Sequence, residues 1–196
     1  MNKKRLILIL SISLLGLIQG NAQTVKIKDS VTSVEKFLKI RDKIATTPEG
    51  GAAIFLFALK IYTDNIKLGK QCLIISVDQE NLQTGEVYQG YDLMPLDDTF
   101  FGRAIYEKNR KLPNSYILGS KPENNYAVKL PYTYEFTTNA SSGDASTGTF
   151  KILVKCSGDP LYRQITMKKN NRGLWKAKEW NAILNSIKKP PFDDKL

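Results

Sequence analysis

The alternation of apolar and polar residues over 126–156 constrains the fold more than any other feature of the sequence. Every second residue from 126 to 136 is apolar, and the same spacing returns from 150 to 156 after a polar, turn-rich segment at 139–148. Successive side chains of a strand point to opposite faces, so this period predicts strands that each bury one face. The two runs, joined by a turn-rich segment, predict an antiparallel pair.

The same sheet is expected to continue toward the C-terminus. Apolar alternation at 165–167 predicts a third strand, and the turn residues at 170–173 lead into a fourth strand around 174–178. We also expect short strands near 87–88 and at 115–119. The sequence therefore predicts an antiparallel sheet of about four to six strands.

Helices are predicted before this sheet. Thr32 and Glu35 form a capping-box pattern ahead of a helix over 33–45. Thr47 at the cap and Pro48 in the first turn begin a second helix over 48–64, whose residues 52–59 are all apolar. A helix that is apolar all round is covered on most sides, so we expect this one to lie on the sheet.

Three further segments have helical spacing. Residues 68–77 favour a helix, although 72–75 also fits a short buried strand. A helix of about three turns is expected from Asp97 and Asp98 until Pro113 ends it, and another over 180–187. The predicted fold class is α+β, with N-terminal helices packed on one face of a curved antiparallel sheet.

The N-terminus has the pattern of a secretory signal peptide. A basic start at 3–5 precedes an apolar run at 6–18 and small residues at 20–22, which predicts cleavage after Ala22. An uncleaved anchor is the alternative. We expect an exported protein, periplasmic or extracellular, with a linker at 23–30, one domain at 31–189 and a tail at 190–196.

The chain is basic, with 29 Lys and Arg against 19 Asp and Glu. Cleavage after residue 22 removes three basic residues and leaves a formal charge of +7. Such an excess favours anionic partners, although basic residues spread along the chain also fit an ordinary solvated surface. The predicted patch for an anionic partner is Lys168, Lys169, Arg172, Lys176 and Lys178.

Chemistry is constrained by the absence of histidine from the whole sequence. This removes Ser-His-Asp and Cys-His nucleophilic sites, histidine zinc sites and the commonest general base near neutral pH. Asp92, Asp97 and Asp98 lie close together and fit acid/base or cation chemistry, but helix capping explains the last two without a ligand. We therefore expect no enzyme, and assign no catalytic residue, metal or cofactor.

Cys72 and Cys156 are the two cysteines of the chain. An even number of cysteines in an oxidising compartment favours one disulfide between them. Two buried free thiols are the alternative, because both cysteines have apolar neighbours in the sequence. The sequence leaves both states open.

Aromatic residues give the candidate ligand site. Tyr126, Tyr132 and Tyr134 share one face of the predicted long strand, and Trp175 is within reach of it from the fourth strand. Buried tyrosine hydroxyls need partners, so this face is a candidate lining for a moist cavity between sheet and helices. Plain core packing is the alternative.

Six segments together resemble a family of exported bacterial proteins that is catalogued as a domain of unknown function. They are 46–53, 69–72, 130–136, 142–144, 150–158 and 168–176. The order of helices, long strands and a Gly-Leu-Trp-Lys ending also resembles the cone-shaped fold of nuclear transport factor 2-like proteins. Neither likeness implies an activity.

From the sequence we expect a binding or interaction domain for a small ligand, or for a protein or glycan partner in the envelope or outside the cell. The two alternatives are an enzyme that uses a carboxylate and tyrosines in a deep pocket, and a binder of anionic polymer through its lysines.

Overall fold

The computed structural model describes residues 22–107 and 109–191. Residues 1–21 of the predicted signal peptide (1–22) and residues 192–196 of the predicted tail (190–196) lie outside the described residues. Among the described residues, no helix is long and apolar enough to cross a membrane.

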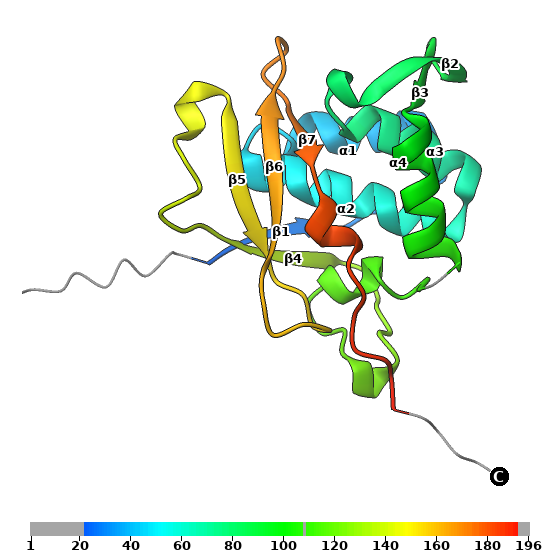
Figure 1. Cartoon of the computed structure of the whole chain (residues 1–196), viewed down its shortest axis with the longest axis vertical. Helices are drawn as coiled ribbons and strands as arrows, with labels where there is room; N and C mark the ends of the chain where they lie inside the picture. The colour runs from blue at the N-terminus through cyan, green and yellow to red at the C-terminus, as the bar shows by residue number, and fades with distance from the viewer. Residues whose placement is uncertain (1–21, 108, 192–196) are drawn as a thin grey trace, which may run out of the picture.

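A five-stranded antiparallel sheet forms one layer of the molecule, in the order β1-β4-β5-β6-β7. Its strands are β1 Gln23–Ile27, β4 Tyr132–Thr137, β5 Thr149–Val154, β6 Arg163–Lys169 and β7 Trp175–Glu179. β1 and β4 run across the direction of β5, β6 and β7, so the sheet is strongly curved (Figure 1). The curvature is sharpest where β4 meets β5, because only two residue pairs are in register there.

Helices cover one face of this sheet, with α2 against it (Figure 1). They are α1 Val34–Ile44, α2 Pro48–Asp64, α3 Ile66–Ser76 and α4 Pro95–Phe101. A separate hairpin of β2 Leu82–Tyr88 and β3 Tyr91–Leu93 lies beside α3. The α+β class, the sheet and the helical state of 68–77 are confirmed.

α2 is the central helix, as its apolar sequence predicts, and fifteen of its residues are buried. The Thr47 side chain caps it by accepting a hydrogen bond from the Gly50 backbone N–H at 3.1 Å. A Cβ at Gly51 would lie 2.6 Å from the Trp175 carbonyl oxygen in β7. Glycine is therefore required for α2 to lie this close to the sheet.

The long strand predicted to start at Tyr126 begins only at Tyr132, so that prediction is wrong for 126–131. Asn125 and Tyr126 have φ of +55° and +53°, in the left-handed region, and Pro131 has no backbone N–H to donate. Of the alternating apolar side chains in this segment, Tyr126 is buried outside any strand, Val128 is half-buried and Leu130 is exposed, so they share no buried strand face.

The linker predicted at 23–30 contains a strand instead. β1 pairs with β4 from Gln23 opposite Phe136 to Ile27 opposite Tyr132. Val25 and Ile27 point toward the core, and Lys26 between them is exposed. β1 has only five residues, so its alternation of apolar and polar residues is too short to predict a strand from the sequence.

Smaller differences concern the ends of elements. Ser33, not Thr32, caps α1 by accepting from the Lys36 backbone N–H. The strand expected at 115–119 is a 3₁₀ turn at Pro113–Tyr116, and the terminal helix is a 3₁₀ turn at Asn181–Leu184. α4 starts at Pro95 and continues as a π-helix over Gly102–Glu107.

Candidate functional site

A cleft of about 830 Å³ opens where the β6–β7 turn, the end of α3, the β2–β3 hairpin and α1 meet, at the upper end in Figure 1. Five cationic side chains line it, and we call it the cationic cleft. They are Arg41, Lys168, Lys169, Arg172 and Lys176. Three carboxylates also line it, those of Asp42, Asp78 and Glu80, so positive charge is in excess.

The β6–β7 hairpin supplies four of these cations because its turn and register hold them together. The Asn170 side chain accepts a hydrogen bond from the Arg172 backbone N–H at 3.0 Å. Gly173 has φ of +78°, which favours glycine and lets the chain reverse. The register then places Lys168 opposite Lys176 on neighbouring strands.

Carboxylates from the segment after α3 compensate two of the lysines. Lys168 lies 3.4 Å from Asp78 and 2.5 Å from Glu80, and Lys178 lies 3.1 Å from Glu80. Hydrogen bonds from Lys168, and then from Lys178, lower the pKa of Glu80. Part of the positive charge of this hairpin is therefore neutralised within the protein.

Lys176 is different, because its ammonium has no carboxylate partner among the described residues. It donates a hydrogen bond to the Ile75 backbone carbonyl at the end of α3. Burial, followed by the charges of Arg41 and Arg172, lowers the pKa of Lys176 to about 8. The cleft thus holds a cation whose charged form is disfavoured by its surroundings.

α1 adds a buried arginine to the same cleft. Arg41 follows Phe37 by four residues and precedes Ile44 by three, so it faces inward with them, and it is only 7% exposed. Its guanidinium pairs with the Asp42 carboxylate at 2.7 Å. Its helical spacing from Phe37 and Ile44 was the sequence signal for this residue, but an inward-facing arginine does not appear in a pattern of apolar positions.

The remaining lining of the cleft combines aromatic and apolar side chains with uncharged polar ones. Tyr88 and Tyr91 come from the β2–β3 hairpin, and Leu38, Ile74 and Leu82 add apolar surface. Cations at one side and tyrosine rings at another suit a ligand that carries an anionic group on a flat or apolar body.

The predicted aromatic residues lie in the core. Tyr126, Tyr134 and Trp175 are at most 3% exposed, and the half-buried Tyr132 lies with its ring edge on Phe57, at 6.0 Å between centroids. None of them lines the cationic cleft or the two other clefts described below. The predicted lysine patch, by contrast, is brought together at the cationic cleft, with Lys178 beside it.

The disulfide expected between Cys72 and Cys156 is wrong in the structure, where both are buried free thiols. Cys72 belongs to α3, and burial raises its pKa to about 12. Cys156 follows β5, with its sulfur 3.3 Å from the Ser115 hydroxyl. Both cysteines belong to the buried core. Two buried free thiols are the alternative that the sequence left open.

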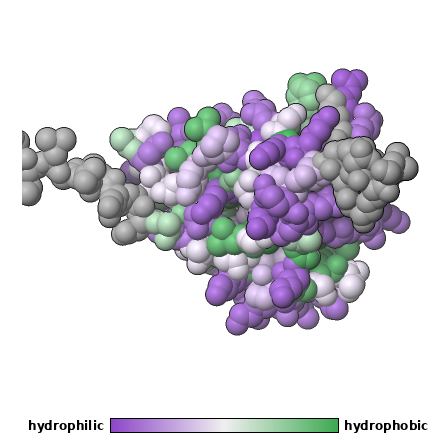
Figure 2. All heavy atoms as spheres, turned by 90° about the horizontal axis from the view of Figure 1, so that it is seen from below, coloured by the Kyte–Doolittle hydropathy of each residue, from purple (hydrophilic) through white to green (hydrophobic). Residues whose placement is uncertain are grey.

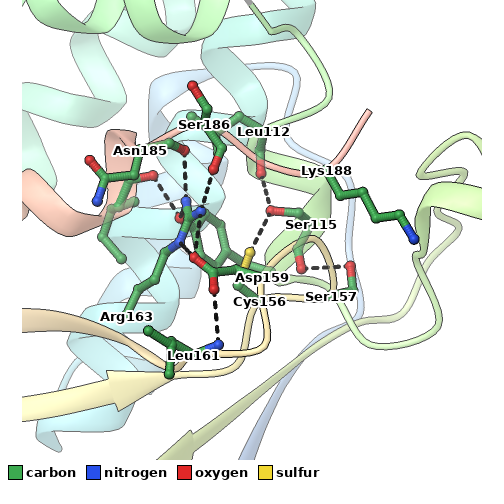
Figure 3. A network of polar contacts seen from close by, with 12 residues as sticks. Leu112, Ser115, Cys156, Ser157, Asp159, Leu161, Arg163, Asn185, Ser186 and Lys188 are labelled. Carbon is green, nitrogen blue, oxygen red and sulfur yellow. Dashed lines mark hydrogen bonds and ion pairs between the residues drawn. The ribbon is translucent and has the colours of Figure 1, made fainter. Parts of the chain in front are cut away.

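A buried arginine network holds the C-terminal segment and was missed from the sequence (Figure 3). Arg163 is 3% exposed and donates to the Tyr116 hydroxyl and to the Asn185 and Ser186 carbonyls at 2.7–2.9 Å. It also pairs with Asp159 at 3.1 Å. Arg163 alternates with the inward-facing Ile165 and Met167 of β6, and this spacing could have shown from the sequence that it is buried. Every contact is internal, so we assign this network to stability.

Two other clefts occur in the described part of the chain. One of about 870 Å³ is lined by apolar side chains such as Phe100, Leu112 and Leu184 beside Arg103 and Lys189. The other, of about 540 Å³, lies between the loop after β1 and α1. No group of three or more described histidine, cysteine, aspartate or glutamate side chains is arranged to hold a metal ion.

Comparison with known proteins gives the family of the chain. Neither curated proteins nor solved structures match it, so the likeness to nuclear transport factor 2-like proteins stays a prediction. One family profile matches residues 30–191, which include every helix and every strand except β1. The chain therefore belongs to the family described as a domain of unknown function (DUF6935).

Proposed function

We propose that this protein is an exported, non-enzymatic binding domain whose cationic cleft holds a small ligand with a carboxylate or phosphate group. The observation that carries the proposal is Lys176, a cation without a described carboxylate partner, held near Arg41 and Arg172 in a cleft. A bound anion would offset both the desolvation of this ammonium and its repulsion by the two guanidinium groups.

The tyrosines of the cleft support a ligand with a flat part beside its anionic group. Tyr91 is 39% exposed, and its hydroxyl is 3.2 Å from the Gln79 amide nitrogen, which orients the ring at the mouth of the cleft. An aromatic or ring-bearing ligand would contact this ring while its anionic group reaches the cations.

The state of the carboxylates favours binding over catalysis. Asp42, Asp78 and Glu80 each form an ion pair with a cationic side chain of the protein, and the pKa of Glu80 is lowered, which works against its use as a general acid. Burial raises the pKa of one carboxyl, Asp97, but this residue lies in the first turn of α4 and does not line the cleft.

The proposal is tested by titrating the protein with phenyl phosphate and measuring binding by calorimetry and by backbone amide NMR. We expect saturable binding, with shifts at 168–176, and loss of about tenfold in affinity for Lys176→Gln or Arg172→Gln. Lys151→Gln, at an exposed site in β5 outside the cleft, is the matched control and should bind as the wild type does. If both cleft variants bind phenyl phosphate with the affinity of the wild type, the proposal is overturned.

Export is part of the same proposal and needs its own measurement. The mass of the protein recovered outside the cytoplasm should correspond to a chain that begins at Gln23. A mass that includes residues 1–22 would contradict cleavage after Ala22.

A further inference from the structure

A second basic surface lies on the opposite side of α1 from the cationic cleft. It is a groove of about 540 Å³ between α1 and the end of β1 with the loop that follows. Five lysines line it, and we call it the lysine groove. They are Lys26, Lys28, Lys36, Lys39 and Lys43. None of these residues lines the cationic cleft.

The lysine groove is strongly positive and its charges are available to a partner. All five lysines are exposed, and none forms an ion pair with a described residue. Asp29 is the one carboxylate that lines it, while the exposed Glu35 is near Lys39. Five like charges that lack internal partners attract anions and repel one another.

The lysines form two rows, one on each element. Lys36, Lys39 and Lys43 follow one face of α1, spaced by about 4.5 and 6 Å along its axis. Lys26 and Lys28 lie two residues apart at the end of β1, about 7 Å from each other. Two rows of charge along a groove suit a chain whose negative groups repeat along its length.

The types of side chain that line the groove favour some classes of polyanion over others. Ile40 and Ile44 are half-buried there, and the groove has no aromatic side chain. Single-stranded nucleic acids are usually held by stacking of their bases on aromatic rings. Binding in a bilayer interface requires exposed large apolar side chains, and none of those in the described residues lines this groove. A chain of sugar acids can be held by charge alone, and the lysine ammonium groups supply compact point charges along the groove.

We infer that the lysine groove binds a linear acidic polysaccharide whose sugars carry carboxylate groups. Three or more consecutive uronic acids would lie along α1, with their carboxylates between the helical and the strand lysines. The groove shares no residue with the cationic cleft, so this binding is independent of the ligand proposed above.

The test is a titration of the mature protein with galacturonate oligomers of ten units, at several salt concentrations. We expect the triple variant Lys36→Gln, Lys39→Gln, Lys43→Gln to lose about tenfold or more in affinity and to depend less on salt. The variant Lys26→Gln with Lys28→Gln, on a different element, should also weaken binding. Both should bind phenyl phosphate as the wild type does.

The matched control is the triple variant Lys67→Gln, Lys129→Gln, Lys151→Gln, because these lysines are exposed, line none of the three clefts and remove the same charge. It should bind the oligomer within about twofold of the wild type, since long-range attraction is screened by salt. Equal losses in the two triple variants would overturn the inference. Tighter binding of oligothymidine or of anionic phospholipid vesicles than of the galacturonate oligomer would do so as well.

Discussion

Buried tyrosines of the core differ in what their hydroxyl groups contact. The Tyr126 hydroxyl donates to the Lys188 carbonyl at 2.6 Å, and the Tyr116 hydroxyl donates to the Ile183 carbonyl at 2.6 Å. The Tyr134 hydroxyl is buried without a hydrogen-bond partner among the described residues. The three side chains therefore have similar burial but different polar contributions to stability.

Removal of single hydroxyl groups should reveal this difference. Tyr126→Phe is expected to lower the free energy of unfolding by about 1 kcal/mol, because the hydrogen bond to the Lys188 carbonyl is lost. Tyr134→Phe should leave the free energy of unfolding unchanged or raise it by up to about 1 kcal/mol, because no hydrogen bond to a described residue is lost. Urea denaturation of the two variants provides the comparison. An equal cost for both would mean that the Tyr134 hydroxyl has a partner.

Lys176 should give the folded protein a distinctive pH dependence. Its pKa is about 8 in the folded protein and 10.5 as an ordinary lysine, so the unfolded chain binds the extra proton between these values. Stability due to this group is lowest below pH 8 and rises as the pH increases toward 10. From pH 7 to 9.5 the wild type should gain about 1–2 kcal/mol relative to Lys176→Gln.

Denaturation curves of the two proteins at matched pH values would measure this gain. Subtracting the curves of the variant removes the contributions of all groups that titrate equally in both proteins. If the difference between wild type and variant does not change with pH, Lys176 has an ordinary pKa in the folded state. Phenyl phosphate, if bound as proposed, should reduce the gain, because an anion raises the pKa of a neighbouring ammonium.

At the scale of elements, the contact between α2 and β7 depends on a glycine. Gly51→Ala adds helix propensity of about 1 kcal/mol, but its Cβ would meet the Cβ and carbonyl oxygen of Trp175 at 2.6 Å. We expect a net loss of about 1–3 kcal/mol in the free energy of unfolding, because backbone must move. Thermal and urea denaturation would measure it.

Gly102 provides the matched substitution for this experiment. Its φ is −57°, and the nearest atom to an added Cβ is 3.9 Å away. Gly102→Ala should therefore be neutral or stabilising by up to about 1 kcal/mol. A stable Gly51→Ala variant with an unchanged Trp175 environment would show that α2 does not lie as close to the sheet as described.

The elements that sequence predicts well are those with long or repeated patterns. α2 has eight consecutive apolar residues, and apolar and polar residues alternate in β5 and β6. The spacing of apolar residues therefore predicts whether each element is a helix or a strand and which face it buries. β1 is too short for this, and residues 126–131 alternate without forming a strand because Asn125 and Tyr126 take left-handed backbone conformations. Backbone conformation of this kind is set by tertiary packing, and a period of two does not reveal it.

The cationic cleft was predictable only in part, for a related reason. Its four hairpin cations are close in sequence, so the patch at 168–178 could be proposed. Arg41 and the acids Asp78 and Glu80 come from distant segments, and only the fold brings them to Lys168 and Lys176. Charge compensation between segments cannot be inferred from composition.

At the scale of the whole molecule, one core includes side chains from the helices and from the sheet, with Cys72 and Cys156 both in it. The face seen in Figure 2 is mostly hydrophilic, with apolar residues in small separate groups. A single buried core that joins the helices to the sheet favours cooperative unfolding of the domain predicted at 31–189.

The two thiols allow a test of this cooperativity. A thiol reagent should label neither cysteine quickly in the native protein, and should label both at the same denaturant concentration, because both become accessible when the core opens. Mass spectrometry of each labelled peptide along a urea series gives the two curves. Labelling of Cys156 well before Cys72 would show that the molecule unfolds in two parts, and failure to label either after unfolding would indicate a disulfide.

The short register between β4 and β5 has a mechanical consequence. Only Phe136 with Val154 and Thr137 with Leu153 are paired in register there, whereas β5 and β6 are paired at six positions. Pulling apart the first junction breaks few backbone hydrogen bonds, so the sheet behaves as two stiff ribbons joined at a flexible corner. α2 contacts strands of both ribbons, so it is the brace that resists bending at that corner.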